Sequence, residues 1–152
     1  MRGMVPPDRI FIITAERLVD DTAAAAWNVP KANIVGEPCK RDTAPAIAVA
    51  CGIVRQRDTG GVVCILTADQ LMSDVETFRQ TLADAIKVAA RQDAVVTIGI
   101  PPTHAATGFG YIEAGEPLET RTVTLFNKAI RFVEKPDVYT AARYLESGRH
   151  YW

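Results

Sequence analysis

The stretch VVCILTADQLMSD, residues 62–74, decides the fold class of this chain. It opens with five apolar or nearly apolar residues, turns polar at Thr67 and reaches a carboxylate at Asp69. A short apolar run without alternation is typical of a strand buried on both faces, as strands of a parallel sheet are. Ligands of open α/β sheets bind outside the carboxyl ends of such strands, so the stretch predicts a site around Asp69.

Comparable apolar runs alternate with helical patterns along the rest of the chain. Strands are predicted over residues 9–14, 33–35, 62–67, 94–100, 123–126 and 129–133, with another short one from about 111. Helices are predicted over residues 15–27, 43–57 and 138–147, and after a capping box formed by Ser73 and Glu76. Strands that alternate with helices predict an α/β sandwich around a mainly parallel sheet.

The helical patterns also predict which faces are buried. The helix over 43–57 is apolar nearly all round and is expected to be buried. The helix after the capping box has one apolar stripe, made of Phe78, Leu82, Ala85, Ile86 and Ala89. The last helix is expected to end at Gly148 and to face inward with Tyr139, Ala142 and Leu145.

Length and charge limit the classes of protein and of partner. The 152 residues suffice for one domain with a real core. The net charge of −1 gives no reason to expect nucleic acid or a membrane surface as a partner. The longest unbroken apolar run, residues 46–51, is too short for a membrane span. Three cysteines without a CxxC spacing predict reduced thiols in a cytoplasmic protein.

Two polar segments near the predicted strand ends are candidate binding sites. Asp69 is placed to hold Mg²⁺ together with substrate phosphates, although a cap on a turn explains its position equally well. Asp74 is expected to have a structural role at the start of the next helix. The loop 37–46, EPCKRDTAPA, precedes a helix N-terminus that suits an anion or a hydrogen-bonding heterocycle. An ordinary loop with a helix cap at Asp42 or Thr43 is the simpler alternative.

Two later segments add candidates for ligand binding. In TGFGYIE, residues 107–113, paired glycines allow the backbone to approach a ligand closely, with a plain β-turn as the alternative. The segment is not a dinucleotide fingerprint, because Glu113 replaces the third glycine and a strand follows. In FVEKP, residues 132–136, Glu134 and Lys135 are expected on opposite faces of a strand end, where they suit two ligand groups better than a mutual salt bridge. A solvated strand end is the alternative there.

Taken together and in this order, the segments resemble mannose-1-phosphate guanylyltransferases, of the sugar-1-phosphate nucleotidyltransferase superfamily. The resemblance rests on RIFIIT (9–14), EPCKRDTAPAIA (37–48), ILTADQLMSD (65–74), TIGIPPTHAATGFGYIEAG (97–115), FVEKPD (132–137) and SGRHYW (147–152). It implies a Rossmann-like α/β sandwich with a mixed, mainly parallel sheet, of which residues 1–152 form part of a single domain. It also implies the reaction of mannose 1-phosphate with GTP to give GDP-mannose and pyrophosphate, assisted by Mg²⁺.

The resemblance further implies a role for each matching residue. The catalytic residues would be Asp69, which would hold the Mg²⁺, and Lys135, which would neutralise the mannose phosphate. The residues around guanine and ribose would be Glu37, Arg41, Asp42 and Thr43. Gly110 would approach the mannose by its backbone, and Glu134 would hydrogen-bond the sugar hydroxyls. Asp42 departs from the family, which usually has Asn there, and so offers an acceptor in place of an amide donor.

Other parts of the family pattern are missing from the chain. The N-terminal glycine-rich loop with its lysine is not present, nor are the Asn-Ser-Gly expected after Trp152 and the second metal-binding Asp. We therefore expect an internal fragment without measurable activity of its own, whose unpaired sheet edge favours a homo-oligomer. Two alternatives stay open: a non-catalytic nucleotide-sugar-binding or interaction module, and a related nucleotidyltransferase that uses another sugar phosphate or NTP.

Overall fold

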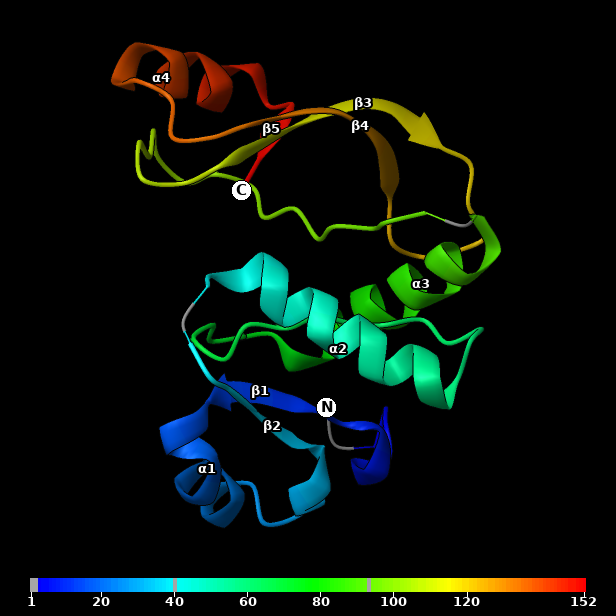
Figure 1. Cartoon of the computed structure of the whole chain (residues 1–152). Coiled ribbons are helices and arrows are strands. Elements are labelled where there is room, and N and C mark those ends of the chain that lie inside the picture. The colour runs from blue at the N-terminus through cyan, green and yellow to red at the C-terminus, as the bar shows by residue number, and fades with distance from the viewer. Residues whose placement is uncertain (1–2, 40, 93) are drawn as a thin grey trace. The chain divides into compact units, whose positions relative to one another are not determined.

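The computed structural model describes residues 3–39, 41–92 and 94–152 (Figure 1). Lys40, which belongs to the predicted loop 37–46, lies outside the described residues. The chain divides into two units, Met1–Leu71 and Met72–Trp152, and each is described by itself.

The first unit is built on a parallel pair of strands. Its elements are η1 (Pro7–Arg9), β1 (Ile12–Ala15), η2 (Glu16–Leu18), α1 (Val19–Ala25), η3 (Lys31–Asn33), β2 (Ile34–Glu37) and α2 (Thr43–Arg57). In the parallel register, Ile12 lies opposite Ile34 and Ala15 opposite Glu37. The strands predicted over 9–14 and 33–35 are therefore confirmed with small shifts, and both end at the same edge of the pair.

A buried asparagine ties the first unit together. Asn33 is 3% exposed, and its amide nitrogen donates to the carbonyl oxygens of Asp8 at 2.8 Å and Ile10 at 3.0 Å. Its amide oxygen accepts from Arg57 at 3.1 Å, and the same guanidinium lies 4.6 Å from the ring centroid of Phe11. Because a buried amide must be paired, these bonds fix the segment before β1, the start of β2 and the end of α2 together.

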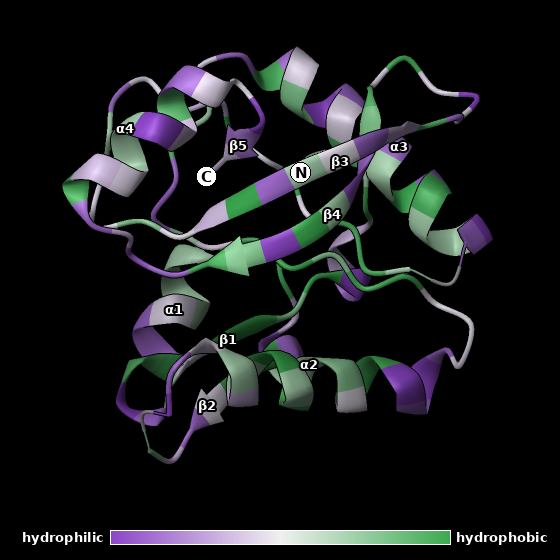
Figure 2. Cartoon of the chain, turned by 90° about the horizontal axis from the view of Figure 1, so that it is seen from above, coloured by the Kyte–Doolittle hydropathy of each residue, from purple (hydrophilic) through white to green (hydrophobic). Residues whose placement is uncertain are grey.

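Helix α2 begins at Thr43 as predicted, but the prediction that it is buried is wrong. Ala50 is its one buried residue, while Ile47 and Val49 are 37% and 46% exposed. Figure 2 shows the helix hydrophobic or neutral along most of its length and hydrophilic at one end. An all-round apolar helix needs neighbours on every side, and the described part of the chain covers only the side that carries Ala50.

The apolar runs over 62–67 and 94–100 form no strand in the described part of the chain, so the predictions of a buried strand over the first and of a strand over the second are wrong. Ile65 is 45% exposed and Val95 is 95% exposed. In the second run, Ile100 exchanges two backbone hydrogen bonds of 2.9 Å with Trp152. An apolar pattern indicates that a segment favours apolar surroundings. A strand, however, forms only where the backbone of a second segment lies beside it and makes the hydrogen bonds of the sheet.

The second unit combines two helices with an antiparallel sheet. Its elements are α3 (Val75–Gln92), β3 (Tyr111–Leu118), β4 (Phe126–Val133), α4 (Val138–Ser147) and β5 (His150–Tyr151). The strand order is β4-β3-β5. The strand predicted over 129–133 lies within β4, whereas of the strand predicted over 123–126 only Phe126 belongs to β4 and residues 123–125 precede it. The bounds predicted for the last helix are confirmed by α4, and Gly148 follows it with a left-handed φ of 62°.

The start of α3 corrects one prediction and confirms another. The backbone N–H and hydroxyl of Thr77 donate to the Asp74 carboxylate at 3.0 and 2.7 Å, so Asp74 caps the helix and the predicted capping box at Ser73 is wrong. The backbone bond from Thr77, followed by the hydroxyl bond, lowers the pKa of Asp74. The structural role predicted for Asp74 is thus confirmed. Of the predicted apolar stripe, Leu82 and Ala85 are buried.

The buried face of α4 differs from the predicted one. Tyr139 is 82% exposed and Leu145 is 37% exposed, whereas Ala141 is completely buried. The ring of Tyr144 stacks on His150, with centroids 3.8 Å apart and planes 11° apart. Apolar residues occur on two sides of this short helix. The packing of Tyr144 against the strand that follows determines which of these sides is buried.

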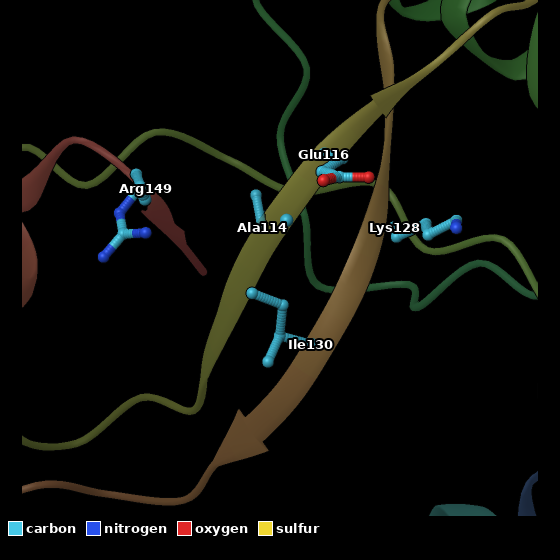
Figure 3. A pocket seen from close by; sticks show the side chains of 6 residues that line it. Ala114, Glu116, Lys128, Ile130 and Arg149 are labelled. Atoms are coloured by element: carbon cyan, nitrogen blue, oxygen red, sulfur yellow. The ribbon is translucent and has the colours of Figure 1, made fainter.

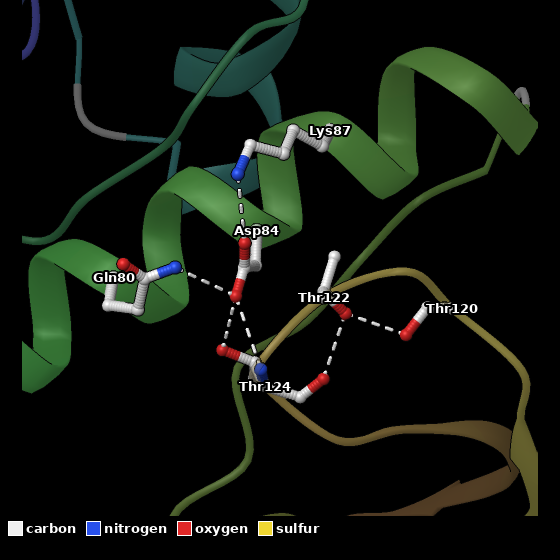
Figure 4. A network of polar contacts seen from close by, with 6 residues as sticks. All are labelled: Gln80, Asp84, Lys87, Thr120, Thr122 and Thr124. Carbon is white, nitrogen blue, oxygen red and sulfur yellow. Dashed lines mark hydrogen bonds and ion pairs between the residues drawn. The ribbon is translucent and has the colours of Figure 1, made fainter.

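A buried carboxylate joins α3 to the segment before β4 (Figure 4). Asp84 is 1% exposed and accepts hydrogen bonds from Gln80 at 3.0 Å and Lys87 at 3.2 Å. The backbone N–H and hydroxyl of Thr124 donate to it at 3.2 and 3.0 Å. These donors, Gln80 foremost, hold the pKa of Asp84 well below its usual range despite burial. Asp84 is therefore a charged carboxylate whose hydrogen bonds connect α3 to the segment before β4.

The cysteine side chains and the lengths of the helices can be compared with two further expectations from the sequence. Cys39, Cys51 and Cys64 are free thiols, as predicted, and partial burial raises the pKa of Cys64. Among the described residues, no helix has the length and apolarity that crossing a bilayer requires.

Replacing Asn33 by alanine should lower the free energy of unfolding of the first unit by about 2 kcal/mol, because two carbonyls and a guanidinium lose their partner. Denaturant unfolding measures this change. Asn28→Ala is the control, because Asn28 is exposed. Equal stability of the two variants would contradict the role of Asn33.

Asp84→Asn should lower the thermal midpoint at neutral pH, because an amide cannot accept from all four donors. A carboxylate whose pKa is depressed by folding contributes stability above its unfolded pKa, near 4, and loses it as pH falls below that value. The variant should therefore lose less of its remaining stability than the parent between about pH 5 and pH 3. Glu76→Gln, at an exposed position of the same helix, is the control. Parallel pH profiles of parent and Asp84→Asn would contradict this account.

Candidate functional site

The predicted nucleotide-binding residues follow one another at the β2–α2 connection of the first unit. Glu37 is the last residue of β2, at the carboxyl edge of the parallel pair, and Thr43 is the first residue of α2. Arg41, Asp42 and Thr43 are exposed. Asp42 occupies the N-cap position, but its side chain makes no capping hydrogen bond. The first-turn N–H groups of α2 therefore have no side-chain acceptor from Asp42, which corrects the alternative of an ordinary cap there.

The backbone of Asp42 is strained. Its φ of 61° and ψ of −166° lie in a region that is essentially restricted to glycine. Such a conformation costs roughly 1–3 kcal/mol and occurs preferentially at ligand-binding sites. The strained backbone therefore coincides with one of the predicted nucleotide-binding residues.

Asp69 lies in an exposed turn after the 62–67 segment. Its carboxylate makes no hydrogen bond or ion pair with the described residues, so the alternative of a capping role finds no support. Within those residues, no group of three or more His, Cys, Asp or Glu side chains could hold a metal ion. A single free carboxylate fits Mg²⁺, which keeps several waters and binds through one or two carboxylates plus phosphates.

In the second unit, the structure brings the two predicted sugar-binding residues together. The antiparallel register sets Tyr111 opposite Val133, so the glycine loop lies beside the end of β4. A Cβ atom on Gly110 would lie 3.1 Å from Oε2 of Glu134. Both residues line a pocket of about 270 Å³, together with Tyr111, Ile112, Phe132, Val133 and Trp152. The lining of the pocket therefore contains one carboxylate and is otherwise mostly apolar.

The predicted separation of Glu134 and Lys135 onto opposite faces is wrong. The Lys135 ammonium lies 3.4 Å from Oε1 of Glu134. The reason is the backbone: β4 ends at Val133 and Lys135 has a φ of 42°, so the alternation of a strand no longer applies. Both side chains are more than half exposed, and such an ion pair contributes little to stability. The lysine is free to exchange this partner for another anion.

A larger hollow on the same unit contains none of the predicted residues. It measures about 410 Å³ and is lined by Ala114, Gly115, Glu116, Lys128, Ile130 and Arg149. Figure 3 shows Ala114 and Glu116 on β3, with Lys128 and Ile130 on the neighbouring strand β4. Its lining carries charges of both signs, from Glu116, Lys128 and Arg149.

Charged groups around β5 hold in place the strands that line the pocket beside Gly110. Arg131 donates to Glu113 at 2.7 Å, and this hydrogen bond lowers the pKa of Glu113. His150 is buried, with Nδ1 2.8 Å from the hydroxyl of Ser147. Burial lowers the pKa of His150, although Glu113 lies 3.9 Å from its Nε2. These contacts hold β5, and with it Trp152, against β3.

Sequence reasoning missed the apolar lining of the pocket. Trp152 and Phe132 line it, and neither was among the candidate residues. No local signal identifies them, because the pairing of distant segments brings them beside Gly110.

The family model for nucleotidyl transferases matches residues 7–152. The chain belongs to the nucleotidyl transferase family. The family assignment agrees with a parallel strand pair whose carboxyl end carries Glu37 and with the loop that follows it.

Curated relatives give the resemblance more detail. The chain is 41% identical over 125 residues to mannose-1-phosphate guanylyltransferase 2 of Escherichia coli O157:H7, covering 79% of this chain and 26% of that protein. It is 41% identical over 119 residues to the xanthan biosynthesis protein XanB of Xanthomonas campestris pv. campestris (strain B100), covering 78% and 24%. The predicted resemblance to mannose-1-phosphate guanylyltransferases is thus confirmed, and the chain spans about a quarter of the length of these relatives.

A solved structure supports the fold. The chain superposes with a TM-score of 0.82 and 29% identity on a protein described as mannose-1-phosphate geranyltransferase from Thermus thermophilus. The match covers 98% of this chain and 41% of that one. The predicted α/β fold class is confirmed by this similarity.

Proposed function

We propose that the chain is part of a nucleotidyltransferase that makes GDP-mannose and pyrophosphate from GTP and mannose 1-phosphate. The observation that carries the proposal is the meeting of Gly110 and Glu134 at one pocket, from segments 24 residues apart in sequence. Relatives named mannose-1-phosphate guanylyltransferase support the choice of sugar and base.

The sugar side of the reaction belongs to the second unit. Glu134 accepts hydrogen bonds from sugar hydroxyls, while the missing side chain of Gly110 lets the sugar approach the backbone. Lys135 leaves its exposed pairing with Glu134 and binds the sugar phosphate as a point charge. The phosphate oxygen is thereby oriented as the nucleophile, which is the main contribution that positioning makes to such a reaction.

The nucleotide side belongs to the first unit. The Watson–Crick edge of guanine presents N–H donors, and the carboxylates of Glu37 and Asp42 are acceptors for them. Arg41 and the uncapped N-terminus of α2 at Thr43 favour the anionic part of the nucleotide.

Asp69 would hold Mg²⁺, which, when bound, neutralises charge on the phosphates. The mannose phosphate oxygen attacks the α-phosphorus of GTP, and the bond to the β-phosphate oxygen breaks with its electron pair leaving on pyrophosphate. Lys135 binds the phosphate group that supplies the attacking oxygen.

The same proposal includes the setting in which the enzyme works. The family match over 7–152 supports one nucleotidyltransferase domain across both units. The free cysteines support a cytoplasmic protein. Exposed apolar residues such as Val95 and Leu125 support a homo-oligomer. The balanced charge supports small-molecule partners over nucleic acid or a membrane.

Asp69→Asn should lower kcat/KM for pyrophosphate release about 100-fold or more, because a metal ion supplies several kcal/mol of charge stabilisation. The assay uses the protein that contains this chain, with GTP, mannose 1-phosphate and titrated Mg²⁺. Asp21→Asn, an exposed carboxylate on α1, is the control. Unchanged turnover in Asp69→Asn would refute its role, and ligand binding without any turnover in the parent would favour the binding-module alternative.

Gly110→Ala should weaken mannose 1-phosphate binding about tenfold while changing the free energy of unfolding by less than about 1 kcal/mol. The new methyl group would press on the exposed Glu134 carboxylate, not on the backbone fold. Calorimetric titration and thermal unfolding measure the two quantities. Gly108→Ala is the matched control, since a Cβ there meets nothing within 4 Å. Equal affinities for the two variants would contradict the placement of the sugar.

A further inference from the structure

Trp152 is one of three aromatic residues, with Tyr111 and Phe132, that line the pocket beside Gly110. The pocket measures about 270 Å³, and its lining also includes Glu134 and Gly110. The remaining walls are apolar and include Ile112 and Phe132. A hexose has the same two kinds of surface, with hydroxyl groups around its edge and C–H groups on its faces.

The position of Trp152 is fixed without help from a ligand. Its backbone exchanges two hydrogen bonds of 2.9 Å with Ile100. Its ring meets His104 and Phe109 edge to face, each at a centroid distance of 5.0 Å, and Tyr111 at 6.4 Å. A binding surface that is already ordered avoids the entropy of ordering it on binding.

Packing alone does not account for an indole at this position. The Nε1–H of Trp152 is buried and has no hydrogen-bond partner among the described residues. A buried donor without an acceptor destabilises a fold by about 1–3 kcal/mol. A phenyl ring would fill an aromatic cluster without that penalty, so packing among the described residues does not by itself favour an indole here.

We propose that Trp152 is a specificity-determining residue of this pocket, whose indole face packs against the C–H face of the hexose while Glu134 binds its hydroxyls. This inference rests on the proposed function. It assigns recognition of the sugar ring to Trp152 and leaves recognition of the phosphate to Lys135. Free sugar should therefore contact Trp152, whereas inorganic phosphate should not.

The chain offers a direct optical test, because Trp27 and Trp152 are its two tryptophans. Trp27 is 79% exposed, so Trp27→Phe leaves Trp152 as the one tryptophan reporter. In this variant, mannose and mannose 1-phosphate should change the emission of Trp152, and inorganic phosphate should not. Emission that stays constant while calorimetry registers mannose 1-phosphate binding would overturn the proposal.

Affinity and selectivity provide the second measurement. Trp152→Leu should weaken mannose 1-phosphate binding about tenfold and leave inorganic phosphate binding unchanged, whereas Trp152→Phe should lose less than about threefold. Trp27→Leu is the control at the other tryptophan. If Trp152→Leu binds mannose 1-phosphate as the parent does, the inference fails and the proposed function stands. If the parent itself does not bind mannose 1-phosphate, the proposed function fails and the inference fails with it.

Discussion

The antiparallel pairing of β3 with β4 is the constraint on which the pocket beside Gly110 depends. Its register sets Tyr111 opposite Val133 and so brings Gly110 to the carboxylate of Glu134. A shift by one residue would turn every side chain of a strand to the other face. The pairing of β5 with β3 then adds Trp152 to the same pocket. Backbone hydrogen bonds, more than any single side chain, determine which residues meet there.

Within the described residues, buried polar side chains also connect distant segments in each unit. Asn33 satisfies two carbonyls and a guanidinium in the first unit, and Asp84 satisfies four donors in the second. Burying such groups is unfavourable unless every partner is present, so each arrangement specifies one geometry. In contrast, the side chains assigned to the reaction are exposed and are not surrounded by several hydrogen-bonding partners, as is the case for Asp42, Asp69 and Lys135. The groups that stabilise the fold and those assigned to the reaction are thus distinct.

Local chemistry was predictable from sequence where neighbouring residues decide it. The bounds of α4, the left-handed Gly148 and the structural role of Asp74 all depend on contacts within a few residues. The strands over 62–67 and 94–100 were mispredicted because a ladder requires a second backbone that the local pattern does not specify. Likewise, the opposite-face prediction for Glu134 and Lys135 assumed strand geometry, which the positive φ of Lys135 ends. Trp152 was missed because its role arises from pairing with Ile100, 52 residues away.

The pocket between Gly110 and Glu134 is central to the proposed function, because the sugar phosphate is assigned to it. Amide NMR spectra recorded while mannose 1-phosphate is added test this assignment most directly. We expect the largest shifts at Gly110, Glu134 and Lys135, with little change at Glu116 and Lys128 of the larger hollow. Shifts concentrated at Glu116 and Lys128, with Gly110 and Glu134 unaffected, would contradict the assignment.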